Sequence, residues 1–222
     1  MTDANKILKE MKDNGAKYLD LRFTDPRGKL QHLTMDGTAV DEDLLNNGTY
    51  FDGSSISGWK AINESDMVLK PDLNTTVMDP FMAQPTMIVF CDILDAVTKE
   101  PYERDPRGTA RKAEELVSSS GVGDTIFMGP EAEFFVFDDV KFQVDMNKSM
   151  FEIDSTEGPY NSGRSYESGN LAHRPGIKGG YFPVPPVDSG QDLRTEFLEE
   201  LKNLGLCVDC LLYTSPSPRD DL

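Results

Sequence analysis

The chain has 222 residues, 38% of them hydrophobic, which is enough to bury a core in one large domain or two small ones. Its 39 Asp and Glu residues outnumber the 22 Lys and Arg residues, and the resulting charge of −17 would repel nucleic-acid backbones and anionic lipid surfaces. Because the sequence lacks a run of about 18 apolar residues and begins with a polar amphipathic stretch, we expect a cytoplasmic protein that binds neither nucleic acid nor membrane.

The N-terminal part of the chain predicts a helix, a hairpin and a loop. A short amphipathic helix ends at the stop signal Asn14-Gly15. In residues 18–35, the alternating stretch YLDLRFTD, the turn DPRG and the stretch KLQHLTM predict a β-hairpin. Residues 41–48 read as a helical turn that Gly48 closes, and the small-residue loop FDGSSISGW follows.

Three further strands are predicted before residue 103. They begin at Met67 (MVLKPD), Thr75 (TTVMD) and Met87 (MIVFCDIL), and the last is the best candidate for a buried strand. Together with the helix and the hairpin, these strands predict a small α+β unit that ends near residue 103.

A second domain is predicted to begin with a helix that Asp105 caps and Gly121 closes. The stretch GPEAEFFVF, residues 129–137, reads as a strand, and the stretches KFQVDM and MFEID read as a pair of strands. Residues 155–180 are rich in Ser, Gly and Pro, and a loop of this length is usually functional or disordered. A helix over residues 192–204 follows.

The cysteines and the C-terminal tail predict no further site. Cys91, Cys207 and Cys210 are odd in number, which favours a reducing compartment over a disulfide scaffold. The last two form C-x-x-C, but no histidine has the spacing of a second ligand pair, so we expect neither a redox nor a zinc site. The peptide CLLYTSPSPRD resembles a translated sequencing adapter, so we expect residues 210–222 to be a non-native tail; the alternative is a disordered Ser/Pro-rich tail.

Two carboxylates in GPEAEFFVF are the first candidate site. Glu131 and Glu133 would point to the same face of a strand, which continues with Phe135 and Phe137. Two anions on an apolar face repel each other and are costly to desolvate, and a hard divalent cation such as Mg²⁺ or Mn²⁺ removes both penalties. The alternative is an edge strand whose carboxylates face water.

The loop in FDGSSISGWKAINESD, residues 51–66, is the second candidate. Gly53, Ser54 and Ser55 permit a sharp bend, and Asp52, a serine hydroxyl and Trp59 could together bind or deprotonate a cationic substrate. The alternative is an ordinary Asx-type turn, in which Asp52 accepts from backbone N–H groups and Trp59 is buried. Taken alone, the stretch favours the turn.

The third candidate is HRPGIKGGYFPVPP, residues 173–186. Its positive charges and the pair Gly179-Gly180, which lets backbone approach a ligand before Tyr181, could hold an anion. The alternative is a solvated Pro/Gly-rich connection. Neither a P-loop nor a G-x-G-x-x-G motif is present in the sequence.

Five stretches in collinear order resemble glutamine synthetase of the bacterial type I class, over about residues 5 to 209. They are YLDLRFTDPRGKLQH, YFDGSSISGWKAINESDMVLKPD, YERDPRGTARKAEE, GPEAEFFVFDDV and HRPGIKGGYFPVPPVDSGQDLRTE. The resemblance implies an α+β fold with a β-grasp domain at 1–103, followed at 104–209 by the incomplete start of the catalytic domain. It also implies ATP-dependent ligation of ammonium to L-glutamate through γ-glutamyl phosphate, Mg²⁺ or Mn²⁺ as cofactor, and a homo-oligomer of two stacked hexameric rings.

The resemblance also assigns roles to single residues. It implies that Glu131 and Glu133 ligate different metal ions, with Glu131 near ATP and Glu133 at the ion facing glutamate. It implies that Asp52 and Ser55 belong to a loop that reaches the neighbouring subunit's site, where the aspartate takes a proton from ammonium. Tyr181 matches an aromatic wall of the ammonium pocket.

The family's next motifs, with histidines, further metal-binding glutamates and substrate arginines, do not follow the helix at 192–204, so we expect the 222-residue chain alone to be inactive and prone to aggregation. Two alternatives stay open. One is a γ-glutamyl-amine ligase of the same superfamily, and the other is a non-enzymatic short β-grasp interaction protein.

Overall fold

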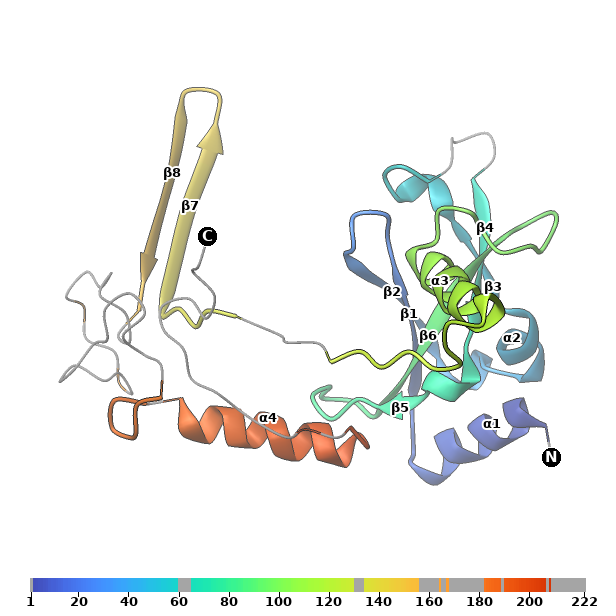
Figure 1. The fold of residues 1–222 in the computed structure, drawn as a ribbon, viewed down its shortest axis with the longest axis horizontal. Helices are drawn as coiled ribbons and strands as arrows, with labels where there is room; N and C mark the ends of the chain where they lie inside the picture. Colours follow the sequence, from blue (N-terminus) through green and yellow to red (C-terminus); the bar gives the residue numbers. More distant parts are fainter. Residues whose placement is uncertain are drawn as a thin grey trace. The chain divides into compact units, whose positions relative to one another are not determined.

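The computed structural model describes residues 2–59, 65–129, 134–155, 164, 167, 182–188, 190–206 and 208 (Figure 1). The chain forms two compact units, Met1–Met128 and Gly129–Leu222. The boundary between these units, after Met128, lies later in the chain than the domain boundary near residue 103 that we expect from the sequence. That domain boundary stays a prediction. In the described part of the chain, no helix is both long and apolar enough to cross a bilayer.

The first unit is built on a mixed β-sheet (Figure 1). Its strands are β1 (Tyr18–Thr24), β2 (Leu30–Asp36), β3 (Thr49–Asp52), β4 (Asp66–Pro71), β5 (Val77–Met78) and β6 (Thr86–Asp95). The strands lie in the order β2-β1-β6-β4-β3, and β5 pairs with β6. Only the β1–β6 pair is parallel among these described pairings. The predicted hairpin and the later strands are confirmed, although β5 is shorter than predicted.

Helices α1 (Asp3–Asp13) and α2 (Glu42–Asn47) supply apolar side chains to the core on one face of this sheet. The Thr2 side chain caps α1, and Gly15, at φ +64°, follows its end, as the stop signal predicted. The sheet's core side chains come from alternate positions of β1, β4 and β6: Leu19, Leu21, Phe23, Met67, Leu69, Met87, Val89, Cys91 and Ile93. Burial raises the pKa of the Cys91 thiol, so this cysteine stays protonated.

A polar network lies on the opposite face, around the fully buried Asp20. The Asp20 carboxylate accepts hydrogen bonds from Arg22 Nε at 2.8 Å and Thr34 Oγ1 at 2.7 Å, and His32 Nδ1 lies 2.8 Å from it. Burial opposes the charge, but these hydrogen bonds outweigh it and hold the pKa of Asp20 below its usual value. Asp20 therefore stays ionised inside the unit.

We expect Asp20→Asn to lower the free energy of unfolding at pH 7 by about 3 kcal/mol, because it leaves charged and polar partners without their anion. The folded pKa of Asp20 lies below an unfolded value of about 3.9, so its stabilisation is present above that value and is lost as the pH falls through the folded pKa. The difference between the two proteins should therefore shrink below about pH 4. Urea unfolding at pH 7 and pH 3 measures it.

The exposed Asp124 provides the matched control for this comparison. Asp124→Asn makes the same chemical change where water replaces the protein partners, so its effect should stay within about 0.5 kcal/mol at both pH values. An Asp20→Asn protein as stable as the control variant at pH 7 would contradict the assignment of Asp20 as a stabilising anion.

Helix α3 (Pro106–Ser120) is fixed to β6 by polar contacts. Asp105 caps it by accepting from Arg107 N at 3.0 Å, and the same buried carboxylate accepts from Ile93 N at 3.1 Å. Arg107 and Arg111 also form ion pairs with Asp72, which follows β4, and with Asp92 of β6. Gly121, at φ +73°, ends the helix. The predicted start and end of α3 are confirmed.

The described part of the second unit contains a hairpin and a helix (Figure 1). Strands β7 (Asp139–Asp145) and β8 (Lys148–Asp154) pair antiparallel, and helix α4 covers Gln191–Asn203. The paired strands and the helix are confirmed. The strand predicted at 129–137 is wrong for its described residues, 129 and 134–137, which do not belong to a strand.

Candidate functional site

Two of the five predicted site residues belong to the described chain. Asp52 ends β3, and Ser55 lies in the 3₁₀ turn η2 (Gly53–Ser55). Glu131, Glu133 and Tyr181 lie outside the described residues. Within the described ranges, no cluster of three or more His, Cys, Asp or Glu side chains could hold a metal ion.

The chain bends sharply after Asp52 because Gly53 is packed against β4. The Gly53 N–H donates to Ser65 O at 2.7 Å, and a Cβ at this position would lie only 2.3 Å from Met67 Sδ. A larger residue at position 53 would collide with the Met67 side chain and crowd Ser65 O, so that either these groups or the turn would have to shift. Gly53 thus determines where Asp52 and the following serines stand relative to the sheet.

Asp52 is an exposed carboxylate held in one orientation by the two serines after it. Its Oδ1 accepts from Ser54 Oγ at 2.6 Å and from Ser54 N at 2.9 Å, and its Oδ2 accepts from Ser55 Oγ at 3.1 Å. The hydrogen bond from the Ser54 side chain, with that from the Ser54 backbone, holds the pKa of Asp52 below its usual value. Asp52 is therefore an oriented anion that a cation can reach from solvent.

The Trp59 ring is buried in the core, so it is not exposed to a ligand at the loop. Its side chain is 5% exposed and packs against Phe23, Phe51 and Tyr102 with ring centroids 5.7, 5.9 and 6.0 Å away. The structure therefore agrees with the turn interpretation for Trp59, and a cation at the loop would meet Asp52 and the serine hydroxyls instead.

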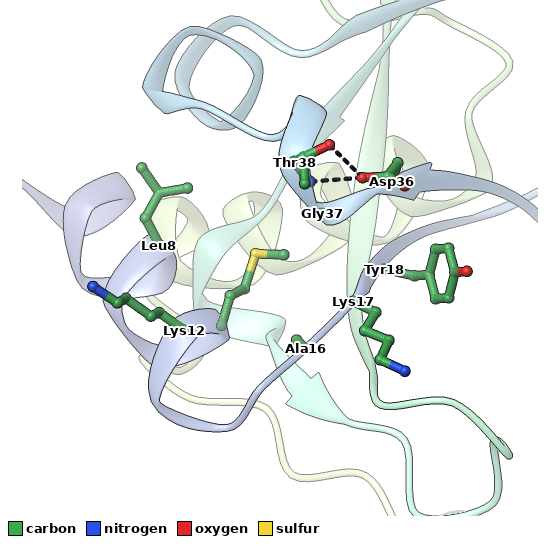
Figure 2. A pocket seen from close by; sticks show the side chains of 9 residues that line it. Leu8, Lys12, Ala16, Lys17, Tyr18, Asp36, Gly37 and Thr38 are labelled. Atoms are coloured by element: carbon green, nitrogen blue, oxygen red, sulfur yellow. Dashed lines mark hydrogen bonds between the residues drawn. The ribbon is translucent and has the colours of Figure 1, made fainter.

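The Asp52 turn has a close counterpart at Asp36. Asp36 Oδ1 accepts from Thr38 N at 2.8 Å and from Thr38 Oγ1 at 2.5 Å, and it caps the 3₁₀ turn η1 (Gly37–Ala39) (Figure 2). The pKa of Asp36 is lowered by hydrogen bonds from Thr38 in the same way. The turn alone is thus not specific to a functional site. Asp52 differs because Ser55 also donates to its second oxygen.

A pocket of about 460 Å³ lies beside this second turn, between α1, residues 16–18 and η1 (Figure 2). Leu8 and Met11 line it together with Lys12 and Lys17, while Asp52, Ser55 and the rest of the candidate loop do not. The pocket is therefore separate from the candidate site.

Sequence reasoning missed three side chains that contact the loop. The Tyr102 hydroxyl donates to Trp59 O at 2.9 Å, Arg104 Nη1 donates to Gly58 O at 2.8 Å, and Arg27 Nη2 donates to Ser57 Oγ at 3.3 Å. These partners are distant in the sequence, so no local spacing pattern could have indicated them.

Two protein-family models together match most of the chain. The family model described as "Glutamine synthetase, beta-Grasp domain" matches residues 15–96, and that described as "Glutamine synthetase, catalytic domain" matches residues 103–213. The chain is 63% identical over 209 residues to the glutamine synthetase of Rhizobium meliloti and 58% identical over 209 residues to that of Azospirillum brasilense. Each alignment covers 94% of this chain and 45% of the relative, so the chain spans less than half the length of these relatives.

A solved structure shows the same fold. The cryo-EM structure of Plasmodium falciparum glutamine synthetase matches 97% of this chain and 44% of its own, with a TM-score of 0.82 at 20% identity. The α+β fold class, with an N-terminal β-grasp domain before a catalytic domain, is confirmed by these matches. The chain therefore belongs to the glutamine synthetase family.

Proposed function

We propose that the chain is part of a ligase that uses ATP to join ammonium to L-glutamate, giving glutamine through γ-glutamyl phosphate. The observation that carries this proposal is the exposed Asp52 carboxylate, oriented by Ser54 and Ser55, in a chain 63% identical to a bacterial glutamine synthetase over 209 residues. Ammonium is a small cation that must lose a proton before its nitrogen can attack. An oriented anion suits both tasks, attraction and proton acceptance.

In this proposal Asp52 takes the proton and Ser55 holds the carboxylate. The hydrogen bonds that keep Asp52 ionised also make it a weaker base, so proton transfer from ammonium to Asp52 is uphill, and the attack of the ammonia that it frees draws the transfer forward. Tyr181 would form a wall of the ammonium pocket. The loop would reach the site of a neighbouring subunit in a homo-oligomer of two stacked hexameric rings, so each site would be shared by two chains.

Glu131 and Glu133 are the proposed metal ligands. Two carboxylates one residue apart are the oxygen donors that Mg²⁺ and Mn²⁺ prefer, so the donor set fits these ions. The bound ions would neutralise charge on the phosphates of ATP. We assign Glu131 to the ion near ATP and Glu133 to the ion facing glutamate. The charge of −17 supports a cytoplasmic enzyme without nucleic-acid or membrane partners.

A chimera tests the proposal. In it, the matching 209 residues of the Rhizobium meliloti relative are replaced by those of this chain. We expect glutamine formation that requires ATP, glutamate, ammonium and Mg²⁺ or Mn²⁺, and a higher kcat/KM for ammonium than for methylamine. Isotope-labelled ammonium followed into glutamine measures the reaction. A chimera that assembles as its parent does but makes no glutamine, while the parent does, would refute the proposed function.

A further inference from the structure

The loop of residues 53–59 is fixed at both of its ends. At its start, the Gly53 N–H donates to Ser65 O at 2.7 Å. At its end, the Trp59 side chain is buried among aromatic rings. We call these two fixed ends the anchors of the loop. Ser55 lies between them, so its position and its hydrogen bond to Asp52 depend on both anchors.

Two side chains of the segment 101–105 hold the C-terminal end of the loop, at Gly58 and Trp59. The Tyr102 hydroxyl donates to Trp59 O at 2.9 Å, and the two rings meet edge to face at 75°. Arg104 Nη1 donates to Gly58 O at 2.8 Å. Successive carbonyls of the loop are therefore bound by side chains two residues apart.

That segment is itself fixed on β6. Pro101 forms a bridge with Leu94, and the Tyr102 N–H donates to Ile93 O at 2.8 Å. The buried Asp105 carboxylate accepts from Ile93 N at 3.1 Å. Residues 101–105 are thus attached to the central strand of the sheet on both sides of the tyrosine.

We propose that Tyr102, assisted by Arg104, is a positioning residue for the use of ammonium. It connects β6 to the loop and so keeps Asp52 and Ser55 where the carboxylate can meet ammonium. The inference rests on the proposed function, in which Asp52 takes the proton. The attraction between the carboxylate and ammonium weakens as their separation grows, so an anchor far from the reacting atoms can still decide how tightly ammonium is bound.

Kinetics of the chimera test the proposal. Tyr102→Phe keeps the ring against Trp59 and removes only the donor, and Arg104→Met removes the second donor. We expect each variant to raise KM for ammonium about fivefold, as for the loss of one hydrogen bond, and the double variant to raise it further. KM for ATP and for glutamate should stay unchanged, and saturating ammonium should restore the rate.

A purely structural role would give a different result. Poor folding would lower the amount of active enzyme and hence the rate with every substrate, without a selective change in KM for ammonium. Tyr18→Phe is the matched control, because it removes the hydroxyl of a tyrosine at the start of β1. It should behave as the unmodified chimera.

Trp59 supplies a readout that does not need ligase activity, because it is the only tryptophan of the 222-residue chain. In that chain, Tyr102→Phe with Arg104→Met should shift its emission to the red and increase quenching by acrylamide, with unchanged circular dichroism. Unchanged emission, or an unchanged KM for ammonium in an active chimera, would overturn the positioning role. An inactive chimera would instead count against the proposed function. The Trp59 emission of the 222-residue chain would then still show whether Tyr102 and Arg104 hold the loop.

Discussion

Replacing Asp52 by Asn in the chimera should lower kcat/KM for ammonium about 10²- to 10⁴-fold, the range usual for loss of a general base. Asn keeps the size of the side chain and one oxygen for the N–H and hydroxyl of Ser54, which lie 2.9 and 2.6 Å from Asp52 Oδ1. It loses the charge that attracts ammonium and the capacity to take a proton. Steady-state assays at varied ammonium measure the effect, and KM for ATP should stay the same.

Asp36→Asn is the control for this prediction. Asp36 makes the same contacts with Thr38 that Asp52 makes with Ser54, so the substitution perturbs an equivalent turn in the same unit. We expect the control chimera to keep its kcat/KM for ammonium. If both variants lose activity equally, or if Asp52→Asn keeps most of it, then the carboxylate does not act as the base.

Gly48→Ala should destabilise the first unit by about 3 to 5 kcal/mol. Gly48 follows α2 with φ +83° and ψ −175°, a conformation that L residues rarely adopt. A Cβ there would lie 2.2 Å from Leu69 O and 2.8 Å from Val68 Cγ1, so β4 would have to move. Urea unfolding of the chain, followed by Trp59 emission, measures the loss of stability.

Gly28→Ala is the control that separates backbone strain from the steric collision of a new Cβ. Gly28 also has φ +83°, but nothing lies within 4 Å of a Cβ at that position. Its substitution should therefore cost only about 1 kcal/mol, from the backbone conformation alone. Equal losses at the two glycines would show that contact with β4 contributes nothing.

Local patterns in the sequence were sufficient for most of the described fold. Alternation in residues 18–35 predicted the β1–β2 hairpin, and Asp105 with Gly121 predicted both ends of α3. These features depend on neighbours in the chain, which a sequence displays directly. The strand predicted at 129–137 failed in its described part because a strand also needs a partner, and alternation says nothing about where that partner lies.

Long-range contacts explain what the sequence could not predict. Alternation put Asp20 on the face opposite Leu19 and Leu21, but its burial depends on Thr34 and Arg22 closing around it. At the candidate site, the Asp52 turn was foreseeable from an aspartate before glycine and serine. The anchoring by Tyr102 was not, because it requires knowing that the segment after β6 returns to the loop.

The placement of β6 sets an order of assembly. Its first half, Thr86–Phe90, pairs in parallel with β1, and its second half, Cys91–Asp95, pairs with β4. The β1–β2 hairpin and the antiparallel β3–β4 pair, on either side of β6, are the more local pairings and can form early, whereas the parallel pairing has to close a long loop, which is slow. During synthesis, a nascent chain that ends before Thr86 holds both strand pairs but lacks the strand that pairs with each of them, so we expect the sheet to become one cooperative body only after this last strand has left the ribosome.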